Sequence, residues 1–450
     1  MKKITALILL FLILFLYPAG FCQDEVSCRG LSLKEAIQAA YQNNKDIQIQ
    51  EAEVKVSEAE IIYSRSKFLP KLDLNAGYTH KGAVSPLTVA NTKKDMGVFA
   101  GYVNQNDLGF ALSDSVYNGG ADWARFKQSR LDLLSSKETL RAKKLDVEFE
   151  AKRLYYGLLL AIETERIAQE LLDNAKAHFK DVESKFNQGT SSQFDYLQSK
   201  VQVSKLVPDL VNAQNTVQVI TAELNKLIGF NVRDAVRPKE QLVFQELEPK
   251  EKEFLTIAYL NKPEMILKSL GIDISKWSIE MAKAGWRPQV NLALGYKWSS
   301  NNNQTLITKR HGNWNAGFAV TVPIFDSFST RAKVDEARSK YEEAVLEKGN
   351  VADQVAVDIR RGCLDLLKSK AIIDAQRDSV WEAEEANRIS IIRYDNGVGT
   401  NLDVLDAEVS LADIRKNLAE GIYDYIMAQA FLERTMGTEY LKEEQYAQKN

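Results

Sequence analysis

The chain contains an internal repeat whose two copies lie 208 positions apart. Residues 185–198 read KFNQGTSSQFDYLQ, and residues 393–406 read RYDNGVGTNLDVLD. Gly189 aligns with Gly397 at this spacing, and Gly229 aligns with Gly437. A repeat of this length predicts two equivalent building blocks within the 450 residues rather than two unrelated domains.

Each repeat is predicted to contain a helix, a β-hairpin, a long helix and a shorter return helix. Apolar residues at helical spacing come first, strict alternation follows a proline, and long stretches without proline complete the repeat. The first repeat spans 23–230, with its hairpin at 70–118, its long helix at 120–187 and its return helix at 192–228. The second spans 253–438, with its hairpin at 288–325, its long helix at 329–396 and its return helix at 401–436. Between them lies a linker, 231–252, and a tail follows at 439–450.

The predicted fold class is therefore mainly α with a small β part. Apolar residues recur every three or four positions along the long helices, which indicates long antiparallel coiled-coil helices. Each repeat opens with a stretch expected to be one helix, the first running from Leu33 to a break at Pro70. The second is expected to begin near Phe254 and to break at Pro288. Both prolines are predicted to end the helix where the chain turns into a strand.

The N-terminus has the pattern of an export signal. Lys2 and Lys3 precede an apolar run from Ile4 to Tyr17 and then small residues, so 1–22 is expected to be a signal peptide. Cys22 could instead be a lipidated N-terminus, although Phe21 is a poor fit to the small residue usually found before such a cysteine. No later apolar run is long enough for a transmembrane helix, so a membrane crossing would have to use strands.

The alternating segments predict four amphipathic strands, which cannot close a membrane barrel within one chain. The alternatives are a soluble sheet or a barrel shared between subunits. The export signal and the aromatic ends of the strands, such as Tyr78 and Trp298, favour the shared barrel. Long polar loops, about 81–104 and 299–313, are expected to connect the strands of each hairpin.

Composition excludes several other classes of protein. Charged residues make up 26% and nearly balance, which argues against a nucleic-acid partner. Three cysteines and three scattered histidines do not form a disulfide framework or a metal-ligand set. No nucleophile, phosphate-loop or metalloprotease motif is present, so we expect no enzyme activity and no cofactor.

Several segments together resemble the TolC-type outer-membrane efflux proteins, also called outer membrane factors. They are LSLKEAI at 31–37, LPKL at 69–72, VYNGG at 116–120, PQV at 288–290 and GVGTNLDVLDA at 397–407. The resemblance covers nearly the whole mature chain. It implies a homotrimer in the bacterial outer membrane whose 12-stranded β-barrel continues as a 12-helix α-barrel in the periplasm. It also implies a passive exit duct of a tripartite efflux or type I secretion system, with a periplasmic adaptor (membrane fusion protein) and an inner-membrane transporter as partners.

The resemblance assigns roles to residues at the helix tips. Asp403 and Asp406 share one helix face and match an acidic ring at the pore entrance. Tyr394 and Asp195 match a gate latch between neighbouring coils, although Gly399 stands where a well-known family member has arginine. Adaptor-contact tips are expected at six residues: Gly189, Thr190, Gly397, Val398, Gly399 and Thr400.

Each of these roles has a simpler structural alternative. The aspartates could belong to a solvated face that complements the helix dipole, and Asp195 to an N-cap. Tyr394 could be a core residue, and the glycines could serve the turns alone. For the whole chain, the alternatives are a periplasmic coiled-coil adaptor, which needs only one helical hairpin, or a structural surface protein, which leaves the aromatic strands unexplained. The sequence does not identify the cargo.

Overall fold

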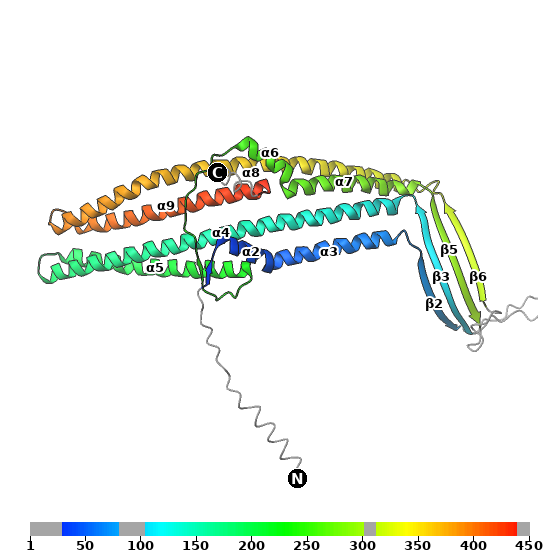
Figure 1. Ribbon diagram of the computed structural model, residues 1–450, viewed down its shortest axis with the longest axis horizontal. Helices are drawn as coiled ribbons and strands as arrows, with labels where there is room; N and C mark the ends of the chain where they lie inside the picture. Colours follow the sequence, from blue (N-terminus) through cyan, green and yellow to red (C-terminus); the bar gives the residue numbers. More distant parts are fainter. Residues whose placement is uncertain (1–28, 81–103, 301–311, 439–450) are drawn as a thin grey trace, which may run out of the picture. The chain divides into compact units, whose positions relative to one another are not determined.

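A computed structural model describes residues 29–80, 104–300 and 312–438 of the chain (Figure 1). The predicted signal peptide with Cys22, most of both outer loops and the whole C-terminal tail lie outside the described residues. Along the residues that are described, no helix combines the length and the apolar character needed to cross a membrane.

The chain forms two compact units, and each unit draws on both sequence repeats. The first unit contains Met1–Asn44, Glu150–Gln245 and Ser369–Asp424. The second contains Lys45–Phe149, Glu246–Lys368 and Tyr425–Asn450. The repeats are therefore units of sequence that do not coincide with the compact units of structure.

The second unit contains a four-stranded antiparallel sheet in the order β2-β3-β5-β6 (Figure 1). Its strands are Lys71–His80 (β2), Asn104–Asn118 (β3), Gln289–Ser300 (β5) and Gly312–Thr321 (β6). The register aligns Leu74, Phe110, Tyr296 and Trp314 in one row across the sheet. All four are exposed, so the predicted apolar face is present and no other part of the described chain covers it.

The long helices run through both units. They are α4 (Ala121–Asn187) and α8 (Ser329–Asp395), and their return helices are α5 (Gln193–Ile228) and α9 (Asn401–Met436). The ends of all four lie within one residue of the predicted bounds. Apolar side chains of the expected seam, such as Ile167, Val182 and Val355, are buried.

The opening stretch of each repeat is two helices, which corrects the prediction of one. In the first repeat, α2 (Leu33–Asn43) ends before an extended Asn44, with φ −65° and ψ 125°, and α3 (Lys45–Ser66) follows. The Asn43 and Asn44 side-chain amides donate to the carbonyls of Ile228 (3.0 Å) and Leu227 (3.3 Å). These hydrogen bonds to residues distant in sequence stabilise the break between α2 and α3.

The second repeat has the same break at a different kind of residue. Here α6 (Glu251–Asn261) and α7 (Pro263–Lys283) meet at an extended Lys262. Pro263 explains this break, because the residue before a proline avoids the helical conformation. A short 3₁₀ helix, η1 (Ala284–Trp286), completes the segment before β5.

The predicted linker contains a strand that the sequence pattern did not show. Val236–Pro238 (β4) pairs in parallel with Arg29–Leu31 (β1). The buried Tyr155 hydroxyl of α4 donates to the Leu31 carbonyl at 2.9 Å and also contacts Glu240. Strands of three residues are too short for alternation to be recognised.

Candidate functional site at the helix tips

The first helical hairpin closes around Gly189, which has φ +77° and needs the freedom of glycine. The Thr190 N–H and hydroxyl both donate to the Lys185 carbonyl, at 2.9 and 3.0 Å. The Ser192 hydroxyl then caps α5, because it accepts the Asp195 N–H at 3.0 Å. The same hydroxyl lies 2.7 Å from the Asp195 carboxylate, to which it donates.

The second helical hairpin repeats this backbone. Gly397 has φ +70°, and the N–H groups of Val398 and Gly399 both donate to the Arg393 carbonyl, at 2.9 and 3.0 Å. The Asp403 N–H donates to the Thr400 hydroxyl at 3.2 Å, while the Thr400 N–H donates to the Asp403 carboxylate at 2.9 Å. This reciprocal pair is the geometry of a capping box.

Asp403 and Asp406 are both exposed in the first turns of α9. Hydrogen bonds from the Thr400 backbone and side chain lower the pKa of the Asp403 carboxyl below its usual value. The carboxylate therefore keeps its charge to lower pH than an ordinary aspartate does. The solvated position in the first turn that was considered for Asp403 is present in the structure, and the capping box with Thr400 leaves its charge exposed.

Tyr394 is half-buried against α4 of the first hairpin. Its ring meets the His178 ring edge-on, with centroids 5.1 Å apart, and the Lys185 ammonium lies 4.4 Å from its centroid. Burial raises the pKa of Tyr394, and the Lys185 charge opposes that rise. Lys185 also pairs with Asp395 at 3.1 Å. Among the described residues no hydrogen bond joins Tyr394 to Asp195, so the two expected latch residues are near each other without direct bonding.

A buried polar link between the hairpins involves Asn401, which sequence reasoning missed. Asn401 is 2% exposed, and its amide oxygen lies 2.7 Å from His178 Nε2 and accepts the Ser199 hydroxyl at 3.0 Å. Its amide nitrogen donates to the Gln198 side chain at 3.1 Å. The first residue of α9 is thus tied to both α4 and α5. An asparagine after a glycine-rich turn is ordinarily a turn residue, so composition alone gives no signal for this role.

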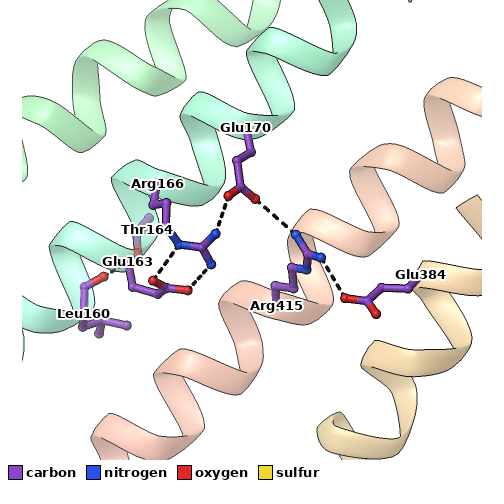
Figure 2. A network of polar contacts seen from close by, with 7 residues as sticks. All are labelled: Leu160, Glu163, Thr164, Arg166, Glu170, Glu384 and Arg415. Carbon is purple, nitrogen blue, oxygen red and sulfur yellow. Dashed lines mark hydrogen bonds and ion pairs between the residues drawn. The ribbon is translucent and has the colours of Figure 1, made fainter. Parts of the chain in front are cut away.

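A second link lies farther along the same helices (Figure 2). Arg415 of α9 pairs with Glu170 of α4 at 3.2 Å and with Glu384 of α8 at 2.7 Å. Arg166 contacts Glu170 and forms a two-bond pair with Glu163 at 2.5 and 2.9 Å. One carboxylate, that of Glu170, is therefore shared by arginines from α4 and α9 (Figure 2).

Pro70 and Pro288, predicted to end helices, lie past the helix ends instead, because α3 ends at Ser66 and η1 ends at Trp286. Pro70 directly precedes β2, and Pro288 directly precedes β5. Elsewhere in the described ranges, no group of His, Cys, Asp and Glu has the arrangement of a metal site. Burial raises the pKa of the Cys363 thiol to about 11, which makes it unsuited to nucleophilic chemistry.

The fold and the tips together define a class of protein, a membrane-associated channel subunit with a helical extension. The features that define it are the duplicated helical hairpins, the β-sheet with an exposed apolar face and the linked tips. The model of the outer membrane efflux protein family matches residues 36–230 and 257–438. The chain belongs to this family.

The relatives agree with the family match. The alkaline protease secretion protein AprF of Pseudomonas aeruginosa is 22% identical over 411 residues, covering 90% of this chain and 84% of AprF. The outer membrane protein TolC of Vibrio cholerae is 20% identical over 411 residues, covering 90% of this chain and 91% of TolC. The crystal structure of the Campylobacter jejuni CmeC outer membrane channel has a TM-score of 0.80 at 18% identity, covering 90% of this chain and 85% of CmeC.

These findings confirm the resemblance found in the sequence. The protein is an outer-membrane channel of the efflux and type I secretion class, and its helical part is periplasmic. Channels of this class work with periplasmic adaptors and inner-membrane transporters. The family consists of channels and not of enzymes.

Proposed function

We propose that three copies of the chain form one passive exit duct across the outer membrane. The observation that supports this assembly is the sheet, which has one continuous apolar face and two edge strands, β2 and β6. An open edge in lipid leaves backbone groups without hydrogen-bond partners. A head-to-tail ring of three copies pairs β2 of each copy with β6 of the next and gives a 12-stranded barrel.

The same ring continues as an α-barrel in the periplasm. Each copy contributes the hairpins α4–α5 and α8–α9, so three copies supply 12 helices. Lipid of the outer membrane covers the apolar face of the barrel, and the polar face lines the lumen. The duct itself carries out no reaction, and the inner-membrane transporter supplies the energy.

The tips form the periplasmic entrance and contact the adaptor. Five of the six predicted contact residues are exposed, Gly399 being partly covered. A Cβ added at Gly189 or Gly397 would meet nothing within 4 Å, which leaves room for an adaptor helix to approach the backbone. Three copies of Asp403 and Asp406 form the acidic ring at this entrance and favour cations.

The gate is held by contacts between the two hairpins of one chain. Tyr394 and Asp195 lie within this contact region, and the contacts of Lys185 and Asn401 complete it. Opening requires the α8–α9 hairpin to move away from α4 and α5, which breaks these contacts.

Detergent extraction of outer membranes and a cysteine scan test the assembly. Single cysteines along β2 are combined with single cysteines along β6. We expect one register of pairs to yield covalent trimers that form ion channels in planar bilayers. A soluble monomer in the periplasmic fraction would refute the proposal.

A further inference from the structure

The polar face of the four-stranded sheet carries a charge pair near the ends of the strands that are remote from the helices. Lys297 of β5 places its ammonium 3.1 Å from the Asp107 carboxylate of β3. The Ser299 hydroxyl donates to the same carboxylate at 2.6 Å, and the Gln105 side-chain amide donates at 3.2 Å. The carboxylate is therefore held by donors from its own strand and from the neighbouring strand.

Small residues surround this pair and leave it open. Lys297 lies directly opposite Gly109 in the register, and Asp107 lies opposite Gly77 on its other side. A Cβ at Gly109 would come within 3.3 Å of the Lys297 Cβ, so glycine lets the lysine lie close to the sheet. The Lys297 side chain remains 55% exposed. Its charge therefore faces the space beside the polar face.

Asp107 and Lys297 are the charged residues on the loop-side half of the polar face, within the described strands. By strand alternation, the other charged residues on that face of the described strands are Lys71 and Asp73, which lie at the helix end of β2. Neighbouring positions on the same face hold neutral residues such as Asn75 and Asn313. The loop-side half therefore has no net charge while the pair is intact.

We propose that Asp107 and Lys297 set the charge selectivity of the outer part of the pore. This inference rests on the proposed function, in which the polar face lines the lumen of a three-copy barrel. Three neutral pairs around the lumen admit cargo and ions of either sign. Loss of one partner leaves three like charges facing the same aqueous space, and such a ring selects ions of opposite sign.

Reversal potentials of single channels in planar bilayers under a potassium chloride gradient test this role. The acidic residues at the tips are first neutralised by Asp403→Asn and Asp406→Asn, so that the outer ring dominates. In this background, Lys297→Met should raise the ratio of potassium to chloride permeability several-fold. Asp107→Asn should shift the ratio toward chloride, and the double variant should return close to the starting value.

A matched control uses another exposed lysine that pairs with a carboxylate. Lys239 pairs with Glu35 at 3.1 Å outside the four-stranded sheet, and Lys239→Met should leave the reversal potential unchanged. Channels that conduct but keep the same reversal potential in both Lys297→Met and Asp107→Asn would overturn the inference. Unchanged reversal potentials are what we expect if the pair only links the two strands, since its loss would then change stability and not selectivity.

The outcomes remain separable from the proposed function. If the unmodified protein forms no channel, the assembly itself is refuted. If Asp107→Asn prevents assembly, Lys297→Met decides the inference by itself, because removing an exposed ammonium leaves Asp107 bonded to Ser299 and Gln105.

Discussion

The two helical hairpins share a backbone but differ in what holds their tips. Gly189 and Gly397 have φ +77° and +70°, so both turns use the same left-handed position. In the first hairpin, Phe186 stacks on Tyr196 within the hairpin, with ring centroids 5.1 Å apart. In the second, the equivalent residue is Tyr394, and it packs against α4 of the first hairpin. The first tip is stabilised by a contact within its own hairpin. The second tip is held by contacts to the other hairpin, which break if the two hairpins separate.

The repeats differ again where each long helix begins. Gly119 and Gly120 precede α4 with φ +71° and +89°. At the same spacing of 208, Ser327 and Phe328 precede α8 with φ +55° and +67°. Glycine adopts this backbone without strain, but a bulky residue such as phenylalanine does not. The second repeat thus retains a strained backbone that the first avoids.

The largest expected effect comes from removing the glycine of the first repeat. In Gly119→Ala, the new Cβ would overlap the Ala284 carbonyl while φ stays positive. Backbone strain and overpacking together should cost about 3 kcal/mol or more. The thermal unfolding midpoint of the extracted protein should fall accordingly. Gly349→Ala is the control, because nothing lies within 4 Å of its added Cβ inside α8, and it should be neutral or slightly stabilising.

The next largest effect is expected from a substitution that breaks the contact between the hairpins. Asn401→Ala leaves His178, Ser199 and Gln198 without their shared partner in a buried position, which should cost about 2 kcal/mol. If these contacts hold the gate, the basal conductance of bilayer-inserted channels should also rise. Gln193 occupies the equivalent place in the first hairpin and is exposed, so Gln193→Ala should change neither quantity. An unchanged conductance in Asn401→Ala would show that Asn401 only stabilises the fold.

A smaller effect, an increase in stability, is expected from a substitution of Phe328. Its side chain is 64% exposed and meets Phe325 edge-on at 5.6 Å. Phe328→Gly removes the strain of a positive φ, which outweighs the added freedom of the unfolded chain, so stability should rise by about 1 kcal/mol. A fall in the unfolding midpoint would instead mean that Phe328 makes contacts in the assembly that exceed its backbone strain.

The sequence predicted long-period features well and local exceptions poorly. The helices and the two-faced strands follow from periodicity, because dozens of residues from Ala121 to Asn187 repeat one preference. The breaks at Asn44 and Lys262 depend on a few residues, and the first is held by partners distant in sequence. The role of Asn401 was unpredictable for the same reason, since its partners come from α4 and α5.

The smallest effect concerns the pH dependence of the acidic tip. Hydrogen bonds from Thr400 lower the pKa of Asp403, so its charge contributes stability above the ordinary carboxyl range. That contribution disappears as the pH falls through the lowered pKa. Thr400→Val removes the hydroxyl and keeps the backbone bond, so the pKa should rise part of the way toward its usual value.

Cation selectivity measured across a pH series distinguishes this effect from a change in the fold. The acidic half of the selectivity curve should shift to higher pH in Thr400→Val, while the plateau near neutral pH should stay the same because Asp403 is ionised there in both proteins. Ser192→Ala removes the matching cap of the first hairpin, whose Asp195 lies outside the proposed ring, and should leave the curve in place. A shift of equal size in Ser192→Ala would show that loosening either tip changes selectivity, so that the two hairpins are coupled and the acidic ring is not a property of the second hairpin alone.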